Sequence, residues 1–488
     1  MWSCPDFTYP DLAREMLRLS SQVALDLKMQ NMNSCFSDPQ PSASVIARRV
    51  EAISEALVSH LSRVEGMDVA IDGDSLRNLL PVLTQPAPAL RSLVINCWDF
   101  VYLPKDLLQR NAPRLRQLCL TDCRPPWDSP ILKNLTVLRV NYFYSSEVST
   151  FRQFITTLAT MIGLRILQLR GCLPSATSLD IIYDHDAVVF PRLQSLDLLG
   201  DGVQCGVLFH SITIPGSCRA WFRCLKRRDL HSSGSETLLS SLTRLKDHSE
   251  RSIQLLLLFV DESYGNEEIK VLAWKEDINL PVLDDVTDAF DFYDIEEDLE
   301  SPASHLPHTY LTVLPNVGST EPIAPIVTRA ISTLPLSQLR TLYLNGSDLV
   351  TETALQYFGR LPHLQMVFIY KRFLSLFFQT LAMPPEENEV CFPAVQTIGL
   401  IDLSLYGLEC GLMNSASTWE TVLDCLVERQ SRGLSVRKMV LRGCSDLDEE
   451  DVNKLRKIDA DLEVEWDEPD SDSLSDSDCT QLSRPGSR

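Results

Sequence analysis

The chain has 488 residues, of which 44% are hydrophobic and 23% are charged, so it is long enough to bury a substantial core. Its 66 Asp and Glu residues outnumber its 44 Lys and Arg residues and give a formal net charge of −22. Because such a charge repels phosphate-rich surfaces, the composition excludes a general binder of nucleic acid or of anionic membranes.

The negative charge is concentrated in two segments. Residues 284–300 carry nine carboxylates and no Lys or Arg, and residues 461–488 carry nine carboxylates and two Arg. These segments account for nine and seven of the 22 net negative charges, which leaves six for the remainder of the chain. We therefore expect an acidic surface insertion and a disordered acidic Ser/Asp tail at 467–488 on a nearly neutral body.

The cysteines and the first residues indicate the compartment. The 14 cysteines include no Cys-x-x-Cys pair, and no apolar signal segment opens the chain. The longest apolar run, 255–260, is too short to cross a bilayer. We expect free thiols, no bound cofactor or metal, and a cytoplasmic or nuclear location.

In chain order, residues 1–62 are expected to form an N-terminal helical or linker segment, with an amphipathic helix over 42–62. Residues 63–199 and 336–466 each contain a block of one short repeat, apolar-x-x-apolar-x-apolar. Residues 200–335 carry only irregular copies of it together with the acidic insertion. Further amphipathic helices are expected over 150–161 and 417–429, and another helix is expected to follow residue 448. The ten copies of the repeat begin at residues 64, 90, 115, 135, 164, 193, 339, 364, 395 and 436.

The repeat predicts the fold class. The second and third apolar residues of each copy alternate, as the buried residues of a short strand do, and a strand this short cannot bury its face alone. Neighbouring copies lie about one strand and one helical return apart, at irregular intervals. The prediction is an α/β fold, namely an irregular leucine-rich-repeat solenoid: a horseshoe of short parallel strands with helical returns.

Three copies carry a cysteine at their ninth position, namely Cys123, Cys172 and Cys444. Leucine-rich repeats have Asn or Cys at this position, where a small polar group bonds the backbone inside the turn. We therefore interpret these thiols as structural.

A solenoid of this kind presents its binding surface on the concave sheet. The residues that alternate with the buried strand positions supply that surface, and Arg, Tyr and Phe among them are common interface anchors. The predicted partner-binding residues are Arg139, Asn141, Gln168, Arg170, Tyr343, Asn345, Phe368, Tyr370 and Arg442, with Asp197 on the same face. No nucleophile elbow, glycine-rich phosphate loop or His-Glu-x-x-His motif occurs, so we expect a non-catalytic protein.

The ordered series LTQPAPALRSLVI, LRQLCLTDC, MIGLRILQLRGC, VVFPRLQSLDLLG, CFPAVQTIGL and VRKMVLRGCSDLDEEDV resembles the fungal, mushroom-type F-box/leucine-rich-repeat-like proteins. The likeness spans residues 2–466. It implies a substrate receptor of a cullin-type (SCF-like) ubiquitin ligase, in which an F-box docks the adaptor and the repeats hold a protein substrate.

One departure from that pattern bears on function. No Leu-Pro start and no Val-Cys-x-x-Trp close of an F-box precedes the repeats, and MWSCPDFTYPDLAREMLRLS resembles the segment that follows an F-box. We expect the chain to begin just after such a module, so that an adaptor binds only if an F-box lies upstream. The alternative is a free-standing leucine-rich-repeat interaction scaffold without ubiquitin-ligase coupling.

Overall fold

A computed structural model describes most of the chain. It covers residues 3–30, 42–142, 150–175, 187–224, 234–245, 252–261, 268–276, 307–313, 323–345, 351–370, 374–382, 390–403, 418–444 and 447–467. The acidic run 284–300 and residues 468–488 of the expected tail lie outside the described residues.

The chain is a mixed α/β protein with a large, mostly parallel sheet that is not closed, and it divides into two compact units. Unit 1 comprises residues 1–253 and 261–335, and unit 2 comprises residues 254–260 and 336–488. Residues 254–260 thus belong to unit 2 although unit 1 continues after them in the sequence.

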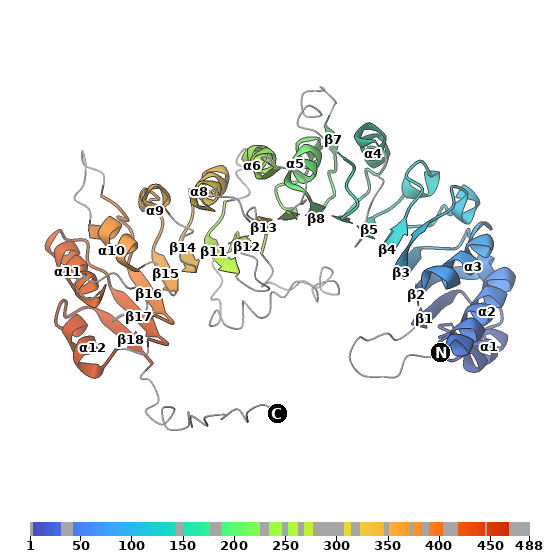
Figure 1. Cartoon of the computed structure of the whole chain (residues 1–488), viewed down its shortest axis with the longest axis horizontal. Helices are drawn as coiled ribbons and strands as arrows, with labels where there is room; N and C mark the ends of the chain where they lie inside the picture. The colour runs from blue at the N-terminus through green and yellow to red at the C-terminus, as the bar shows by residue number, and fades with distance from the viewer. Residues whose placement is uncertain are drawn as a thin grey trace, which may run out of the picture. The chain divides into compact units, whose positions relative to one another are not determined.

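Strands of unit 1 run side by side, with helices against one face of the sheet (Figure 1). Neighbouring strands are parallel except for one antiparallel pair at the end of the order, β13 with β12. In sheet order the strands are β1 (Leu25–Gln30), β2 (Val64–Ile71), β3 (Ser92–Tyr102), β4 (Gln117–Arg124), β5 (Val137–Asn141), β6 (Ile166–Arg170), β8 (Ser195–Gly200), β10 (Arg219–Cys224), β13 (Thr309–Val313) and β12 (Glu268–Trp274). Strands β7 (Val188–Val189) and β9 (Ile212–Thr213) form a separate parallel pair.

The helices of unit 1 are α1 (Pro10–Leu19), α2 (Ala43–His60), α3 (Gly73–Leu83), α4 (Phe151–Leu158), α5 (Gly202–His210), α6 (Gly234–Leu242) and α8 (Ile323–Thr333). Short 3-10 turns lie between them at η1 (Leu61–Arg63), η2 (Leu107–Arg110), η3 (Pro130–Leu132) and η5 (Thr243–Leu245).

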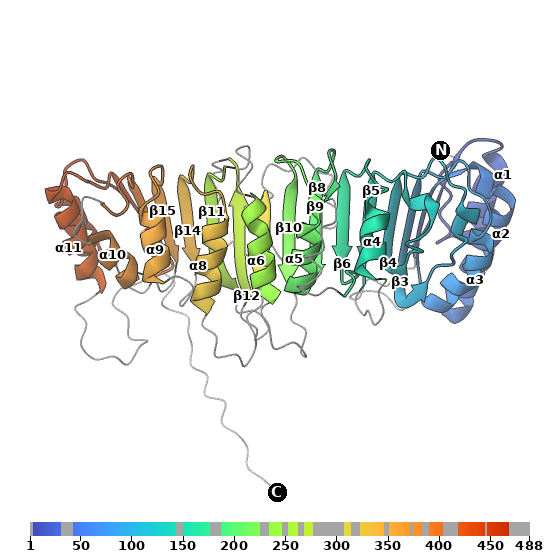
Figure 2. The same cartoon turned by 90° about the horizontal axis from the view of Figure 1, so that it is seen from above.

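Unit 2 repeats the same plan with strands that are parallel throughout. Their order is β11 (Leu255–Asp261), β14 (Thr341–Asn345), β15 (Met366–Tyr370), β16 (Thr397–Ile401), β17 (Lys438–Arg442) and β18 (Glu463–Trp466). The helices are α9 (Glu352–Gly359), α10 (Leu374–Ala382), α11 (Thr418–Ser431) and α12 (Glu449–Arg456). Within each unit the turned view in Figure 2 shows the helices lying in front of the strands.

The repeat pattern has a simple structural origin. Its first apolar residue lies in a turn before the strand and is buried, as at Leu115, where the amide donates to the carbonyl of Ala112. The next two apolar residues, Leu118 and Leu120 in this copy, point into the layer between sheet and helices. Strand pairing then aligns Leu118 with Leu138 in the next copy, so that successive leucines stack into one continuous core.

Helix boundaries follow local capping chemistry. Thr150 and Asp448 accept hydrogen bonds from backbone amides at the starts of α4 and α12, and Asp201 forms a capping box with Gln204 at the start of α5. The helices expected over 42–62, 150–161 and 417–429 and after 448 are confirmed as α2, α4, α11 and α12.

Two expectations need correction. The segment 1–62 is not only helical or linker, because it contains β1, an edge strand that pairs in parallel with β2. Its alternation in LDLKMQ, with Leu25, Leu27 and Met29 buried, is the signal that the repeat search missed, since the leading position of the pattern holds only a small, exposed residue, Ala24. The strands of the irregular region are also not all parallel, because β12 runs antiparallel to β13.

Candidate functional site

The predicted binding residues lie on the face of each sheet that the helices leave uncovered, called here the helix-free face. In unit 1, strand pairing aligns Arg139 with Gln168, and Gln168 with Asp197. A second row, displaced by two residues, aligns Asn141 with Arg170. The repeat register therefore brings these residues from β5, β6 and β8 together.

Several of these side chains are engaged within the molecule. Gln168, Arg170 and Asp197 are only 3%, 6% and 1% exposed, whereas Arg139 and Asn141 are half-buried. The Arg170 Nε and Nη2 donate to Asp197 Oδ2 at 2.9 and 2.8 Å. Arg223 of β10 donates through Nη2 to both Asp197 oxygens, at 3.2 and 2.9 Å.

The cluster of Arg170, Asp197 and Arg223, called here the arginine–aspartate cluster, differs from the exposed surface that alternation alone suggests. Alternation identifies the face to which a side chain points. The sequence of a single strand does not distinguish a solvated arginine from one that is paired with a carboxylate. The detectable signal is an Asp on one strand and an Arg two positions further along on the strand at either side of it. The register pairs both Arg170 and Arg223 with Leu199, which lies two residues after Asp197. Arg223 is the member that the sequence analysis missed.

In unit 2 the helix-free face carries an aromatic stack. The rings of Tyr343 and Phe368 lie 4.5 Å apart with an interplanar angle of 9°. On the other side of Phe368 is Gly399, where a Cβ atom would lie only 2.1 Å from Phe368 Cδ1. A glycine at this position lets the Phe368 ring lie flat over the backbone of β16, which holds it between two strands.

The neighbouring row of unit 2 contains the other predicted residues. Asn345, Tyr370 and Arg442 occupy equivalent positions of β14, β15 and β17, with Ile401 between the last two. Tyr370 and Tyr343 are buried, at 3% and 7% exposure, whereas Asn345, Phe368 and Arg442 are half-buried. Solvent therefore reaches Phe368, Asn345 and Arg442 of this set.

A charged network borders these residues at the edge of the unit 2 sheet. Arg442 Nη2 donates to Glu465 Oε1 at 2.6 Å, and Lys438 Nζ lies 2.8 Å from Glu463 Oε1 and 3.0 Å from Glu465 Oε2. Hydrogen bonds from Arg442 and Lys438 hold the pKa of Glu465 below its ordinary value, and the bond to Glu465 raises the pKa of Arg442. Glu463 and Glu465 were not predicted, although the alternation in EVEW places both on this face.

The repeat cysteines bond the backbone, as expected for Cys172 and Cys444. Each thiol lies 3.5 Å from a carbonyl oxygen of the preceding strand, Val140 for Cys172 and Leu400 for Cys444. Burial raises the pKa of Cys172 and raises that of Cys444 to about 11. The thiol of Cys97 on the neighbouring strand, together with burial, raises the pKa of Cys123.

These thiols are predicted to resist alkylation in the folded protein. Because the thiolate is the reactive form, burial and a raised pKa both slow attack at Cys172 and Cys444, whereas Cys4 is exposed. Iodoacetamide at mildly alkaline pH, read residue by residue by mass spectrometry, should modify Cys4 before Cys172 and Cys444, which should react only with global unfolding. Labelling of Cys444 at the rate of Cys4 would contradict this assignment.

The arrangement supplies contact chemistry: a fixed aromatic ring, an amide and paired charges. Among the described residues, no group of three or more His, Cys, Asp or Glu side chains is placed to hold a metal ion. Of the helices in the described ranges, none has the length and apolar character needed to cross a bilayer.

Comparison with known proteins adds no assignment. No protein-family profile matches the chain, and no curated protein matches it.

Proposed function

We propose that the chain is a non-catalytic leucine-rich-repeat protein that binds a protein partner through its helix-free face. The repeated strand-and-helix unit, the parallel register and the stacked leucines support a solenoid of leucine-rich repeats. Arg139 and Asn141 in unit 1 and Asn345, Phe368 and Arg442 in unit 2 form the accessible part of the proposed binding residues.

The observation that carries the proposal is the fixed, half-buried Phe368. Its ring is stacked on Tyr343 and lies against Gly399, so little side-chain entropy remains to be lost when a partner packs on it. Aromatic residues held in this way, with an arginine nearby, are typical anchors of protein interfaces.

In finer terms, we propose that the partner is a substrate of an F-box-type ubiquitin ligase and that this chain contributes the recognition part. The support is the resemblance of the repeat series to fungal F-box/leucine-rich-repeat-like proteins. A location in the cytoplasm or nucleus belongs to the same proposal, and the described cysteines are all free, as a reducing compartment allows.

Phe368→Ala tests the binding face. Loss of an interface anchor is expected to cost about 2 kcal/mol, or about thirtyfold in affinity. Proteins captured by the tagged chain, quantified by mass spectrometry, should include a partner lost from Phe368→Ala and from Arg442→Glu. The matched control is Val427→Ser on α11, an exposed apolar residue of the helical layer, which should keep that partner. Equal capture by Phe368→Ala would overturn the proposed face.

Ubiquitin-ligase coupling has a separate test. If the coding sequence upstream of Met1 encodes an F-box, the extended protein should capture the adaptor, and the chain of 488 residues should not. An upstream sequence without an F-box, together with partner capture that depends on Phe368, would support the alternative of a free-standing scaffold.

A further inference from the structure

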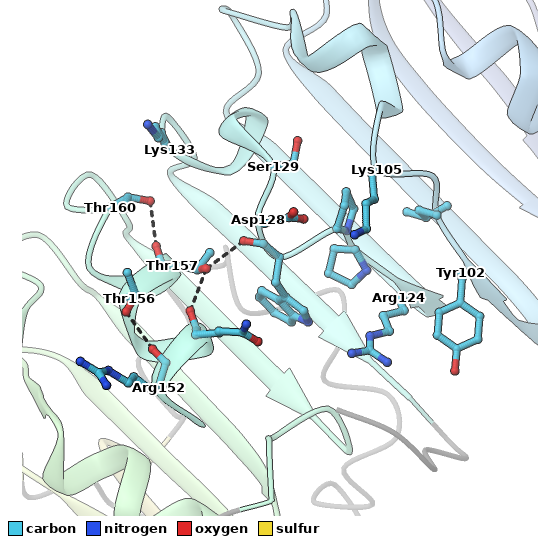
Figure 3. Close-up of a pocket in the computed structure, with 15 residues that line it drawn as sticks. Tyr102, Lys105, Arg124, Asp128, Ser129, Lys133, Arg152, Thr156, Thr157 and Thr160 are labelled. Atoms are coloured by element: carbon cyan, nitrogen blue, oxygen red, sulfur yellow. Dashed lines mark hydrogen bonds between the residues drawn. The ribbon is translucent and has the colours of Figure 1, made fainter. Parts of the chain in front are cut away.

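A second surface lies apart from the helix-free face, at the edge of the unit 1 sheet where β3 and β4 end. A groove of about 760 Å³ opens there between the ends of these strands, the following loop and α4 (Figure 3). Its lining combines aromatic and proline residues with four basic side chains, Lys105, Arg124, Lys133 and Arg152, and one acidic side chain, Asp128.

The charge of this groove is opposite to that of the whole protein. Four cations and one carboxylate line it, on a chain with a formal net charge of −22. The four cations come from different parts of the chain: the loop after β3, the end of β4, the loop before β5 and the first turn of α4. In Figure 3, Lys105 and Arg124 lie on one side of the groove and Lys133 and Arg152 lie on the other.

Three of these cations are available to a ligand. Lys105, Lys133 and Arg152 are exposed, and none forms an ion pair or side-chain hydrogen bond with another residue in the part of the chain that the structure describes. Arg124 is already placed over the ring of Tyr102, 5.5 Å from its centroid. The groove therefore presents positive charge that its described neighbours do not neutralise.

The three threonine hydroxyl groups of the groove are used within the protein. Thr156 donates to the Arg152 carbonyl at 2.8 Å, Thr160 donates to the Thr157 carbonyl at 2.8 Å, and Thr157 lies 2.8 Å from the Trp127 carbonyl. Trp127 is buried against Phe154, with ring centroids 4.8 Å apart. Internal contacts thus fix the walls of the groove, and the cationic side chains are the charged donors left for a ligand.

We propose that this groove binds an extended, carboxylate-rich peptide segment of a protein partner. Its cations are spread over two walls instead of converging on one point, so they match several separated carboxylates better than a single phosphate group. A long nucleic acid would carry its charge beyond the groove onto a strongly negative protein, which disfavours it. This site is independent of the proposed face around Phe368.

The test is binding of a fluorescein-labelled Asp/Glu-rich peptide to the full chain, followed by fluorescence anisotropy. The combined variant Lys105→Glu/Lys133→Glu/Arg152→Glu should weaken binding at least about tenfold, because three attractive charges become repulsive. These residues are exposed, so the thermal midpoint should change little. The matched control Arg114→Glu/Arg165→Glu/Arg192→Glu reverses three other exposed arginines of unit 1 and should keep affinity within about twofold.

Four results would overturn the proposal: equal binding by the groove variant, equal binding of an Asn/Gln counterpart of the peptide, tighter binding of single-stranded DNA, or binding only when the peptide carries phosphoserine. The groove variant should also keep the partner that depends on Phe368, so failure of this proposal can be told apart from failure of the proposed function.

Discussion

Asp197→Asn is expected to lower the free energy of unfolding of unit 1 by about 3–5 kcal/mol, because it removes the only carboxylate of the arginine–aspartate cluster. The Asp197 and Arg170 side chains are 1% and 7% exposed, and that of Arg223 is 15% exposed. Without the Asp197 charge, two arginines from the strands on either side of β8 lie close together in a poorly hydrated environment. Removing one partner of a buried ion pair leaves an uncompensated charge and is strongly destabilising. Replacing the whole pair by apolar residues of similar volume changes the stability far less.

The measurement is urea unfolding, followed by hydrogen exchange at the amides of β6, β8 and β10, because two units need not unfold in one transition. Asp74→Asn is the matched control, since Asp74 also pairs with an arginine, Arg77, but its side chain is 92% exposed. That exposed pair should contribute less than about 1 kcal/mol. A loss at Asp197 no larger than the loss at Asp74 would contradict the buried-cluster assignment.

Arg429→Met is expected to destabilise unit 2 by about 2–4 kcal/mol, because Arg429 joins α11 to α10 and to residues 391–392 through three backbone carbonyls. Its side chain on α11 is fully buried and donates through Nη1 to the carbonyls of Leu381 and Cys391, at 3.3 and 3.1 Å, and through Nη2 to that of Phe392 at 2.9 Å. Methionine preserves much of the length but removes the guanidinium that donates to these buried carbonyl oxygens.

Arg429→Lys should recover only part of the loss, since an ammonium group cannot span three carbonyls as the planar guanidinium does. Arg437→Met is the matched control on an exposed arginine of the same unit and should change stability by less than about 0.5 kcal/mol. Denaturant unfolding of unit 2, read by hydrogen exchange in α10 and α11, measures the effect. Equal stabilities of Arg429→Met and Arg437→Met would show that Arg429 does not join these segments.

Local rules predicted the elements that carry the full repeat. The copy at Leu115 has one buried residue in a turn and two on the strand, with the same spacing as the other copies. The place of a residue within its copy therefore predicts its place in the sheet. The search missed strand β1 because an exposed alanine, Ala24, stands where the other copies have a buried Leu or Val. It missed the antiparallel direction of β12 because connections, and not alternation, set the direction of a strand.

For the candidate site, the sequence determined the face but not the accessibility. Alternation assigned Arg139, Arg170, Phe368 and Arg442 to one side of their strands, since neighbouring residues of a strand point to opposite faces. Burial depends on what the neighbouring repeats contribute. Arg170 became part of a buried ion cluster because Asp197 lies diagonally across from it on the neighbouring strand, two residues before its register partner Leu199.

The sequence by itself determined the composition of this protein, its repeat, its helix caps and the apolar side of each strand, because these depend on residues within one or two turns of the chain. Only the tertiary structure decided which charges pair, that Gly399 makes room for Phe368, and that Lys105, Lys133 and Arg152 face one groove. The physical reason is that these relations join residues of different repeats, and their distances follow from strand register and helix packing.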